Sequence, residues 1–283
     1  MNNRYIDTPN KFVKVGSVSF VYRELGSPAG TPLILLNHFT GVLDDWDPRV
    51  VDGLAAERRV MTFDNRGVGG SEGETPSSIA EMADDAIAFI RALGLETVDL
   101  LGFSMGGYIA QTIVQKNPQL VRKLILAGTG PAGGAPPGSQ SASSVGRLVQ
   151  QVQARAAAEK KHPKNYLFFT QTANGQAAAE GFLARLQERK TDRVPPASER
   201  TKAAHVAALD GWRQSDPSGL GAVRQPTFIA NGDHDAMVPS EKSFELLQRI
   251  PNAILSIYPD GGHAGVFQFH DVFLPQALAF LRA

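Results

Sequence analysis

The chain alternates short, largely apolar runs with amphipathic helical runs, and this rhythm restricts the possible fold more than any other feature. Runs of strand length occupy residues 32–36, 60–63, 97–103 and 121–127. Continuous apolar runs of this length are typical of strands buried on both faces of a sheet. Between residues 78 and 93 apolar side chains recur every three or four positions, which predicts an amphipathic helix, and a second helix is expected at 105–115. Such alternation predicts parallel strands joined by right-handed helical crossovers.

The rhythm is interrupted once. Residues 128–138 are rich in Gly and Pro and are expected to form a loop, and residues 141 to about 215 have a wholly helical pattern. Strands are expected again at 226–230 and 254–258, helices at 240–249 and up to 283, and a hairpin at 11–25. We therefore predict a doubly wound, mostly parallel α/β sheet built from residues 1–130 and 220–283. Residues 131–219 form a helical insertion, expected to be a lid where ligands bind at the carboxyl ends of the strands.

Charge and composition exclude several classes of function. Lys plus Arg number 28, as do Asp plus Glu, so the chain has no net basic field for a phosphate backbone, and we expect no nucleic-acid partner. No apolar stretch approaches the ~20 residues that span a bilayer, so no membrane partner is expected. The first residues lack the apolar core of a secretion signal, and a cytoplasmic location is expected. The absence of Cys excludes disulfides and thiolate chemistry.

The sequence Gly-Phe-Ser-Met-Gly at residues 102–106 fits the pattern Gly-x-Ser-x-Gly, directly after an expected strand and before an expected helix. This is the context of a nucleophile elbow, in which a sharp turn exposes the serine. Glycines on both sides lack a Cβ and allow strand and helix to close around that turn. An N-cap serine is the simpler alternative, but an N-cap needs neither glycine. Ser104 is therefore the candidate nucleophile.

A serine nucleophile needs a general base, and the base needs an orienting acid. His263 follows the last expected strand after two glycines, so we expect it on the same sheet edge as Ser104. Two carboxylates, Asp233 and Asp235, compete for the role of acid after the strand that ends at residue 230, and either could instead form an Asx-turn. The chain order Ser, Asp, His, each after a strand, favours a triad. His162 and His205 lie in the helical insertion and are expected at solvated faces. His270, just before the final helix, is expected to be a capping or surface residue.

Four segments jointly resemble the α/β-hydrolase family, over about residues 1–130 and 220–283. They are the elbow at 102–106, the Asp-Asn-Arg-Gly-Val-Gly-Gly-Ser loop at 64–71, the Gly-x-x-Asp-x-x-Val-Pro turn at 232–239, and the Gly-His pair at 262–263. The resemblance implies a Ser104–His263 pair with Asp235, rather than Asp233, as its acid. The segments are most similar to cofactor-free esterases, lactonases and perhydrolases, which implies no cofactor and no metal.

The same resemblance implies an oxyanion hole made by the backbone N–H groups of Met105 and Phe39. The family usually reads His-Gly-x after the first central strand, whereas this chain reads Asn37, His38 and Phe39. An imidazole therefore replaces a glycine near the site. His38 could tune the hole or a bound water, or it could hold the loop through a hydrogen bond, and we favour the second interpretation.

Candidate pocket residues are mostly apolar, and those in the insertion could equally form its own core. They are His38, Phe168, Phe169, Phe182, Trp212 and Val266. No Arg or Lys in the motifs offers a clamp for a carboxylate, so the expected partner is a small, mostly apolar substrate. The oligomeric state is not determined by the sequence.

We predict a serine hydrolase that cleaves a carboxylic ester through an acyl-enzyme on Ser104. A lactone, a carbon–carbon bond beside a ketone, or perhydrolysis would use the same triad. A ligand receptor that keeps the triad and turns over slowly is an alternative of a different class.

Overall fold

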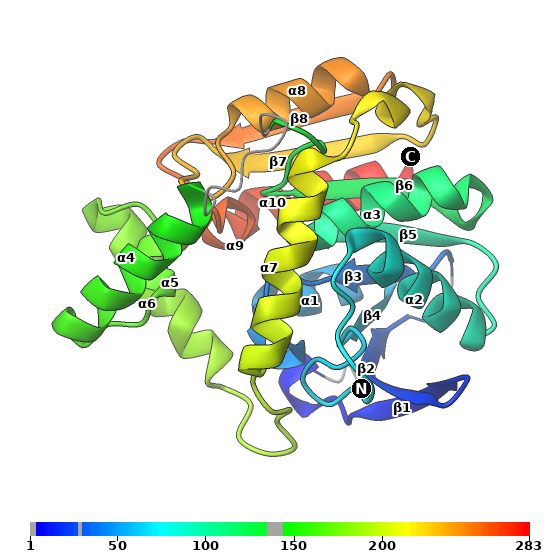
Figure 1. Ribbon diagram of the computed structural model, residues 1–283, viewed down its shortest axis with the longest axis horizontal. Helices are drawn as coiled ribbons and strands as arrows, with labels where there is room; N and C mark the ends of the chain where they lie inside the picture. The colour runs from blue at the N-terminus through cyan, green and yellow to red at the C-terminus, as the bar shows by residue number, and fades with distance from the viewer. Residues whose placement is uncertain (1–3, 28–29, 135–143) are drawn as a thin grey trace.

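Eight strands form one sheet in the order β1-β2-β4-β3-β5-β6-β7-β8 (Figure 1). The computed structural model describes residues 4–27, 30–134 and 144–283. The strands are β1 (Lys11–Val15), β2 (Val18–Gly26), β3 (Leu33–Leu36), β4 (Arg59–Phe63), β5 (Val98–Phe103), β6 (Val121–Ala127), β7 (Thr227–Gly232) and β8 (Ala253–Tyr258). Only β2 pairs antiparallel with its neighbours, β1 and β4, and the remaining pairs are parallel. The predicted mostly parallel, doubly wound α/β sheet is confirmed.

Ten α-helices occupy the described chain. They are α1 (Pro48–Ala55), α2 (Ile79–Ala92), α3 (Met105–Lys116), α4 (Ser144–Glu159), α5 (Lys164–Leu167), α6 (Ala173–Leu186), α7 (Glu199–Gln214), α8 (Glu241–Arg249), α9 (Gly265–Gln268) and α10 (His270–Arg282). Short 3-10 turns lie at Tyr5–Asp7, Leu43–Asp45, Pro118–Leu120 and Ser218–Ala222. The helix expected from residue 78 begins one residue later because the Ser78 side chain accepts the N–H of Glu81 and caps it.

The central strands bury both faces, as their apolar sequences predict. In β5, Val98 and Leu100 join the core formed with α2, α3 and α8, whereas Leu101 and Phe103 join the core formed with α1 and α10. This alternation follows from the two-residue repeat of a strand. Each face of the sheet is therefore covered by helices, and the carboxyl ends of the strands are left for a site.

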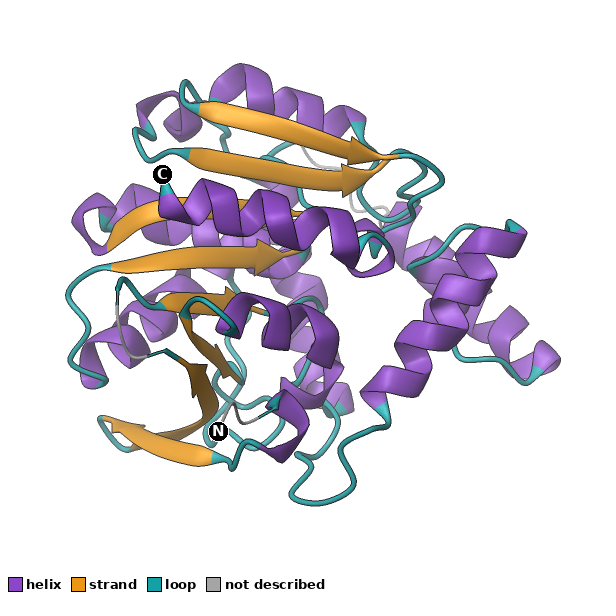
Figure 2. Ribbon diagram, turned by 180° about the vertical axis from the view of Figure 1, so that it is seen from behind, coloured by secondary structure: helices purple, strands orange, loops and turns teal. Residues whose placement is uncertain are grey.

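Helices α4 to α7 lie between β6 and β7 in the sequence, and the arrowheads of the central strands point toward them (Figure 2). The loop expected at 128–138 is described only to residue 134, and the expected helix start at residue 141 also lies outside the described residues. An ion pair and a hydrogen bond tie the end of α6 and the following segment to the sheet domain. Arg185 donates to both carboxylate oxygens of the buried Asp47, and the Val194 N–H donates to Asp44 at 2.8 Å.

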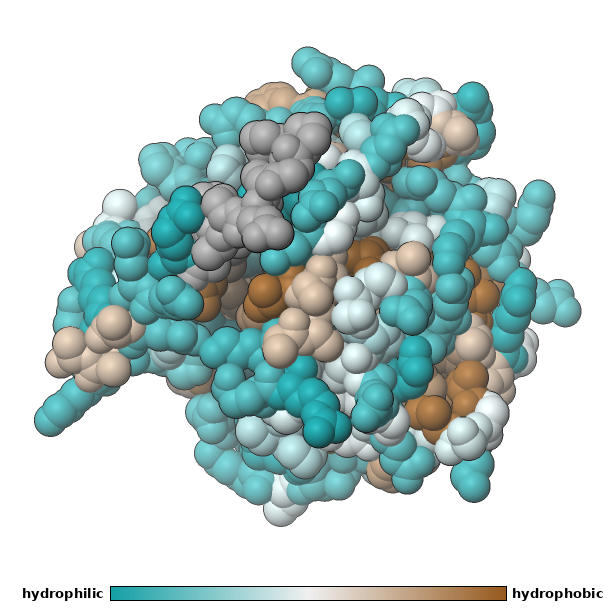
Figure 3. Space-filling view, viewed as in Figure 1, coloured by the Kyte–Doolittle hydropathy of each residue, from teal (hydrophilic) through white to brown (hydrophobic). Residues whose placement is uncertain are grey.

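Polar residues dominate the molecular face seen in Figure 3, with apolar residues showing as separate areas. Among the residues that the structure describes, the exposed large apolar side chains are Phe12, Val206, Phe244, Ile254 and Val272. Within the described residues, no helix has the length and hydropathy to cross a bilayer.

Candidate active site

Ser104 sits in a sharp turn between β5 and α3, with a backbone φ of 55° that non-glycine residues rarely adopt. The flanking glycines are required by space. A Cβ on Gly102 would lie 2.4 Å from the carbonyl oxygen of Gly106, and a Cβ on Gly106 would lie 2.0 Å from that of Leu36. The turn leaves Ser104 partly exposed at the carboxyl edge of the sheet. Backbone strain of this kind clusters at functional sites.

His263 follows β8 and is buried, and its Nδ1 lies 2.8 Å from Oδ2 of Asp235. The other carboxylate oxygen, Oδ1, accepts the backbone N–H groups of Met237 and Val238 at 2.8 and 2.9 Å. Three donors thus fix the orientation of this carboxylate. Because the carboxylate accepts, the imidazole donates from Nδ1, and its Nε2 is left as the proton acceptor.

The competing carboxylate, Asp233, has a different environment. Its side chain is about one-third exposed, and its Oδ1 pairs with the exposed His234 and accepts the Gly261 N–H at 3.1 Å. Burial opposes ionisation of Asp233, but the hydrogen bond from His234 and those from the 260–261 backbone lower its pKa. Of the two carboxylates, Asp235 is the one that contacts His263.

The ends of β5 and β6 bring His263 next to the serine turn. The Ser104 N–H donates to the carbonyl oxygen of Ala127 at 2.9 Å. A Cβ on the next residue, Gly128, would lie 3.4 Å from Cε1 of His263. The ring of Phe103, which precedes Ser104, lies 5.0 Å from the His263 ring. Serine, histidine and Asp235 therefore gather at one sheet edge, as the sequence predicted.

The loop after β3 packs against the first turn of α3, where backbone N–H groups have no partner within the helix. The Asn37 side chain holds this loop: its amide oxygen accepts the His38 N–H at 2.8 Å and its NH₂ donates to Val42 at 2.7 Å. His38 Nδ1 donates to the carbonyl oxygen of Phe39 at 2.8 Å. The hydrogen bond that we favoured for His38, one that holds the loop, is thus present.

The electrostatics around His38 keep it neutral. Burial and the nearby Lys164 lower the pKa of His38 to about 4. Lys164 is bonded to Asp45, and although burial opposes ionisation, this charged partner lowers the pKa of Asp45 to about 2. A charged pair from α5 and the sheet domain therefore lies beside the neutral His38 and the Phe168 ring.

Most of the predicted pocket residues come together in one aromatic cluster. The Phe168 ring lies 5.3 Å from His38 and 5.4 Å from His263. Phe182 lies 6.3 Å from Phe168 and 5.5 Å from Phe169, and Val266 belongs to the same apolar core. These side chains make the surroundings of His263 apolar.

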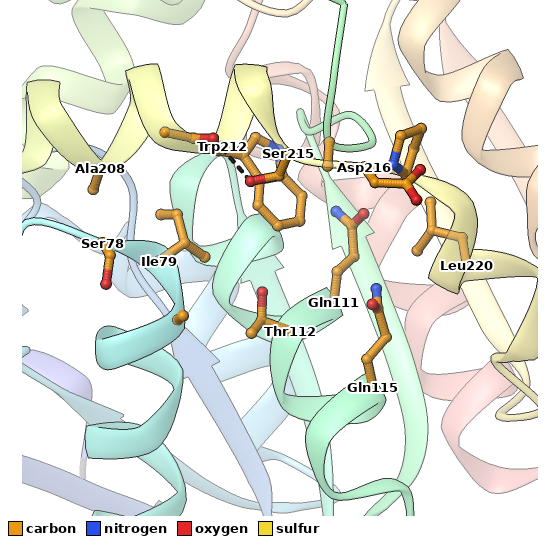
Figure 4. A pocket seen from close by; sticks show the side chains of 14 residues that line it. Ser78, Ile79, Gln111, Thr112, Gln115, Ala208, Trp212, Ser215, Asp216 and Leu220 are labelled. Carbon is orange, nitrogen blue, oxygen red and sulfur yellow. Dashed lines mark hydrogen bonds between the residues drawn. The ribbon is translucent and has the colours of Figure 1, made fainter.

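Trp212 lies elsewhere. Its ring stacks on Tyr108 of α3 with centroids 5.0 Å apart, and it lines a cavity of about 290 Å³ together with Gln111 and Thr112 (Figure 4). Neither Ser104 nor His263 lines this cavity. Trp212 thus contacts α3 rather than the aromatic cluster around His263, and its place in the substrate pocket stays a prediction.

Two of the histidines expected to be solvated are in fact buried. His205 is fully buried, and its Nδ1 accepts the Thr40 N–H at 3.0 Å beside the Phe39 ring. Its burial could have been inferred from spacing, since one helical stripe is formed by Thr201, His205, Ala208 and Trp212.

His270 is also buried and donates to Phe267 at 3.0 Å, so the expectation of a surface or capping role was wrong. His162 is exposed, as expected.

In the described part of the chain, no group of three or more His, Cys, Asp or Glu side chains is arranged to hold a metal ion.

The sheet order, the strained serine turn and the His263–Asp235 pair define an α/β hydrolase. The chain belongs to the α/β hydrolase fold family, whose model matches residues 31–269. The family members it resembles include hydrolases, and the chain is an enzyme of hydrolytic class.

Individual relatives match over nearly the whole chain. An α/β hydrolase fold protein from Chitinophaga pinensis superposes with a TM-score of 0.90 at 36% identity, covering 99% of this chain and 100% of that one. A Rhizobium rhizogenes protein named "Putative carbamate hydrolase RutD" is 27% identical over 93% of this chain and 97% of its own length. A Synechocystis protein named "Putative non-heme chloroperoxidase" is 28% identical, over 94% and 96%.

Proposed function

We propose that the protein hydrolyses a carboxylic ester of a small, mostly apolar molecule through an acyl-enzyme on Ser104. The observation that carries the proposal is the buried His263–Asp235 hydrogen bond of 2.8 Å at the sheet edge where Ser104 is held at φ 55°. A serine hydroxyl is a weak nucleophile at neutral pH, and an oriented imidazole base is what activates it.

In the first step, Ser104 Oγ bonds to the ester carbonyl carbon and its proton passes to Nε2 of His263. The carbonyl becomes an oxyanion, and backbone N–H groups of Met105 and Phe39 stabilise it. Asp235 stabilises the imidazolium through its hydrogen bond to Nδ1. His263 then gives the proton to the leaving alcohol as the carbon–oxygen bond breaks.

In the second step, water attacks the acyl-enzyme and gives its proton to His263. The tetrahedral intermediate collapses, the proton passes to Ser104 Oγ, and the carboxylic acid is released. The same groups therefore act twice, with the proton returning to its starting position.

The apolar surroundings of His263 support an apolar acyl or alcohol group. Phe103 and Phe168 lie within 5.4 Å of its ring centroid. Lys164, a charged side chain beside Phe168, is paired with Asp45 and is therefore not available for a substrate carboxylate.

Carbamate hydrolysis is a second candidate, supported by the name of the Rhizobium relative, which aligns over 93% of this chain. A carbamate carbonyl would use the same serine, base and oxyanion donors. Its carbonyl carbon is less electrophilic because nitrogen donates electron density to it, so an ester is expected to react faster at the same site.

The test is hydrolysis of p-nitrophenyl esters from acetate to decanoate, with a p-nitrophenyl carbamate measured in parallel. Ser104→Ala is expected to lower kcat by about 10⁵–10⁶-fold, since the members of a triad act as a unit. The control is Ser215→Ala: Ser215 is exposed on the C-terminal end of α7, and its removal should leave kcat unchanged. A loss of less than tenfold in Ser104→Ala would refute the proposal.

A further inference from the structure

His205 of α7 contacts the loop that carries Phe39, although 165 residues separate it from its partner Thr40. The Thr40 N–H donates to Nδ1 of His205 at 3.0 Å, and the imidazole is fully buried. A backbone N–H can only donate, so Nδ1 is the unprotonated nitrogen and the proton of the neutral ring is on Nε2. The Thr40 N–H is thus the donor of this hydrogen bond, and His205 is the acceptor.

The loop needs such an external contact because its conformation is unfavourable in isolation. Thr40 has a φ of 56°, a region that β-branched residues rarely adopt. Strain of this kind persists only where surrounding contacts enforce it. His205 provides one such contact from an element outside the loop.

The two peptide units that flank Phe39 are both held. In the first, the His38 carbonyl oxygen accepts the Gly41 N–H at 2.9 Å. In the second, the Phe39 carbonyl oxygen accepts from the His38 ring at 2.8 Å and from the Thr40 hydroxyl at 2.7 Å. The remaining polar group of the second unit is the Thr40 N–H, and His205 accepts it. With His205 in place, the direction of the Phe39 N–H is fixed from both sides.

We propose that His205 is a positioning residue for the oxyanion hole: by accepting the Thr40 N–H it orients the Phe39 N–H, so that the hole is complete only when α7 is docked. This inference rests on the proposed acyl-transfer function. It means that a helix of the inserted segment contributes to transition-state stabilisation without touching substrate.

The neutral form of His205 is maintained by its environment, since burial lowers its pKa to about 4. Contacts along the same face of α7 fix the position of the helix independently of His205. Thr201 Oγ1 donates to the Gly67 carbonyl oxygen at 2.9 Å, and Trp212 stacks on Tyr108. Replacing the imidazole is therefore expected to alter the loop more than the docking of α7.

The experiment compares His205→Leu, which retains bulk without an acceptor, with His205→Asn, whose Oδ1 can occupy the place of Nδ1. With the p-nitrophenyl ester that wild-type protein cleaves best, His205→Leu should lower kcat by about 10–100-fold, while KM changes by less than about threefold, since a misoriented oxyanion donor weakens only transition-state binding. His205→Asn should restore kcat to within about threefold of wild type. Equal losses in both variants, no loss in His205→Leu, or a change in KM alone would overturn the inference.

A second measurement needs no variant. Nitrogen NMR of the wild-type histidine rings should show His205 as the Nε2–H tautomer, with Nδ1 accepting a hydrogen bond. The Nδ1–H tautomer would overturn the contact itself. Absence of Ser104-dependent ester cleavage would instead refute the proposed function, and the tautomer would still report on the Thr40–His205 contact.

Discussion

Replacing Asp235 by Asn changes one atom in the proposed triad, and the surrounding hydrogen bonds determine how the new side chain must lie. The position of Oδ1 accepts two backbone N–H groups, from Met237 and Val238. An NH₂ group there would face two donors, so the amide oxygen must take that position. The NH₂ group then occupies the position of Oδ2, 2.8 Å from Nδ1 of His263.

The consequence is a wrong tautomer of the base. His263 Nδ1 would have to accept a hydrogen bond, so the ring proton would move to Nε2, the atom that should take the proton of Ser104. A wrong tautomer in a serine triad costs about 10⁴-fold in kcat, which is about 5 kcal/mol of activation free energy. Because Asn matches Asp in shape, the fold should persist.

The assay is kcat on the best p-nitrophenyl ester, with urea unfolding to verify that each variant is folded. Asp233→Asn is the matched control, because this neighbouring carboxylate is partly exposed and pairs with His234. It should retain kcat to within about tenfold. A loss below tenfold in Asp235→Asn, or equal losses in the two variants, would refute the assignment of the acid.

Two further predictions concern stability. Gly106→Ala should lower the free energy of unfolding by about 1–3 kcal/mol, since its Cβ would lie 2.0 Å from the Leu36 carbonyl oxygen. Gly211→Ala in α7, where a Cβ has no atom within 4 Å, should raise the free energy of unfolding by about 0.5–1 kcal/mol. Equal effects of the two variants in urea unfolding would contradict the steric argument. The folded-state pKa of His205, about 4, lies below the unfolded value of 6.5, so the unfolded state binds more protons as pH falls below 6.5 and stability declines until about pH 4. Between pH 8 and pH 5 this amounts to about 2 kcal/mol. The decline should be smaller by that amount in His205→Asn, and identical pH profiles of the two proteins would contradict it.

The sequence alone determined the sheet and the elements that carry the site. Apolar runs such as residues 32–36 can be buried only as central strands, and their alternation with amphipathic helices fixes a parallel sheet. The glycines around Ser104 indicate a sharp turn because a side chain does not fit there. These features are local, so sequence patterns suffice to predict them.

Contacts between distant segments were decided only by the tertiary structure. The resemblance of residues 232–239 to the family's acid turn already favoured Asp235 over Asp233, but only the tertiary structure shows that Asp235 contacts His263, because both carboxylates follow the same strand end. His205 was expected at a solvated face because it lies in the helical insertion, away from the motifs of the site. Its partner, Thr40, lies 165 residues away, and only the docking of α7 brings the two together. The same docking turns Trp212 toward α3, because the rotation of a helix about its axis depends on the surface it packs against.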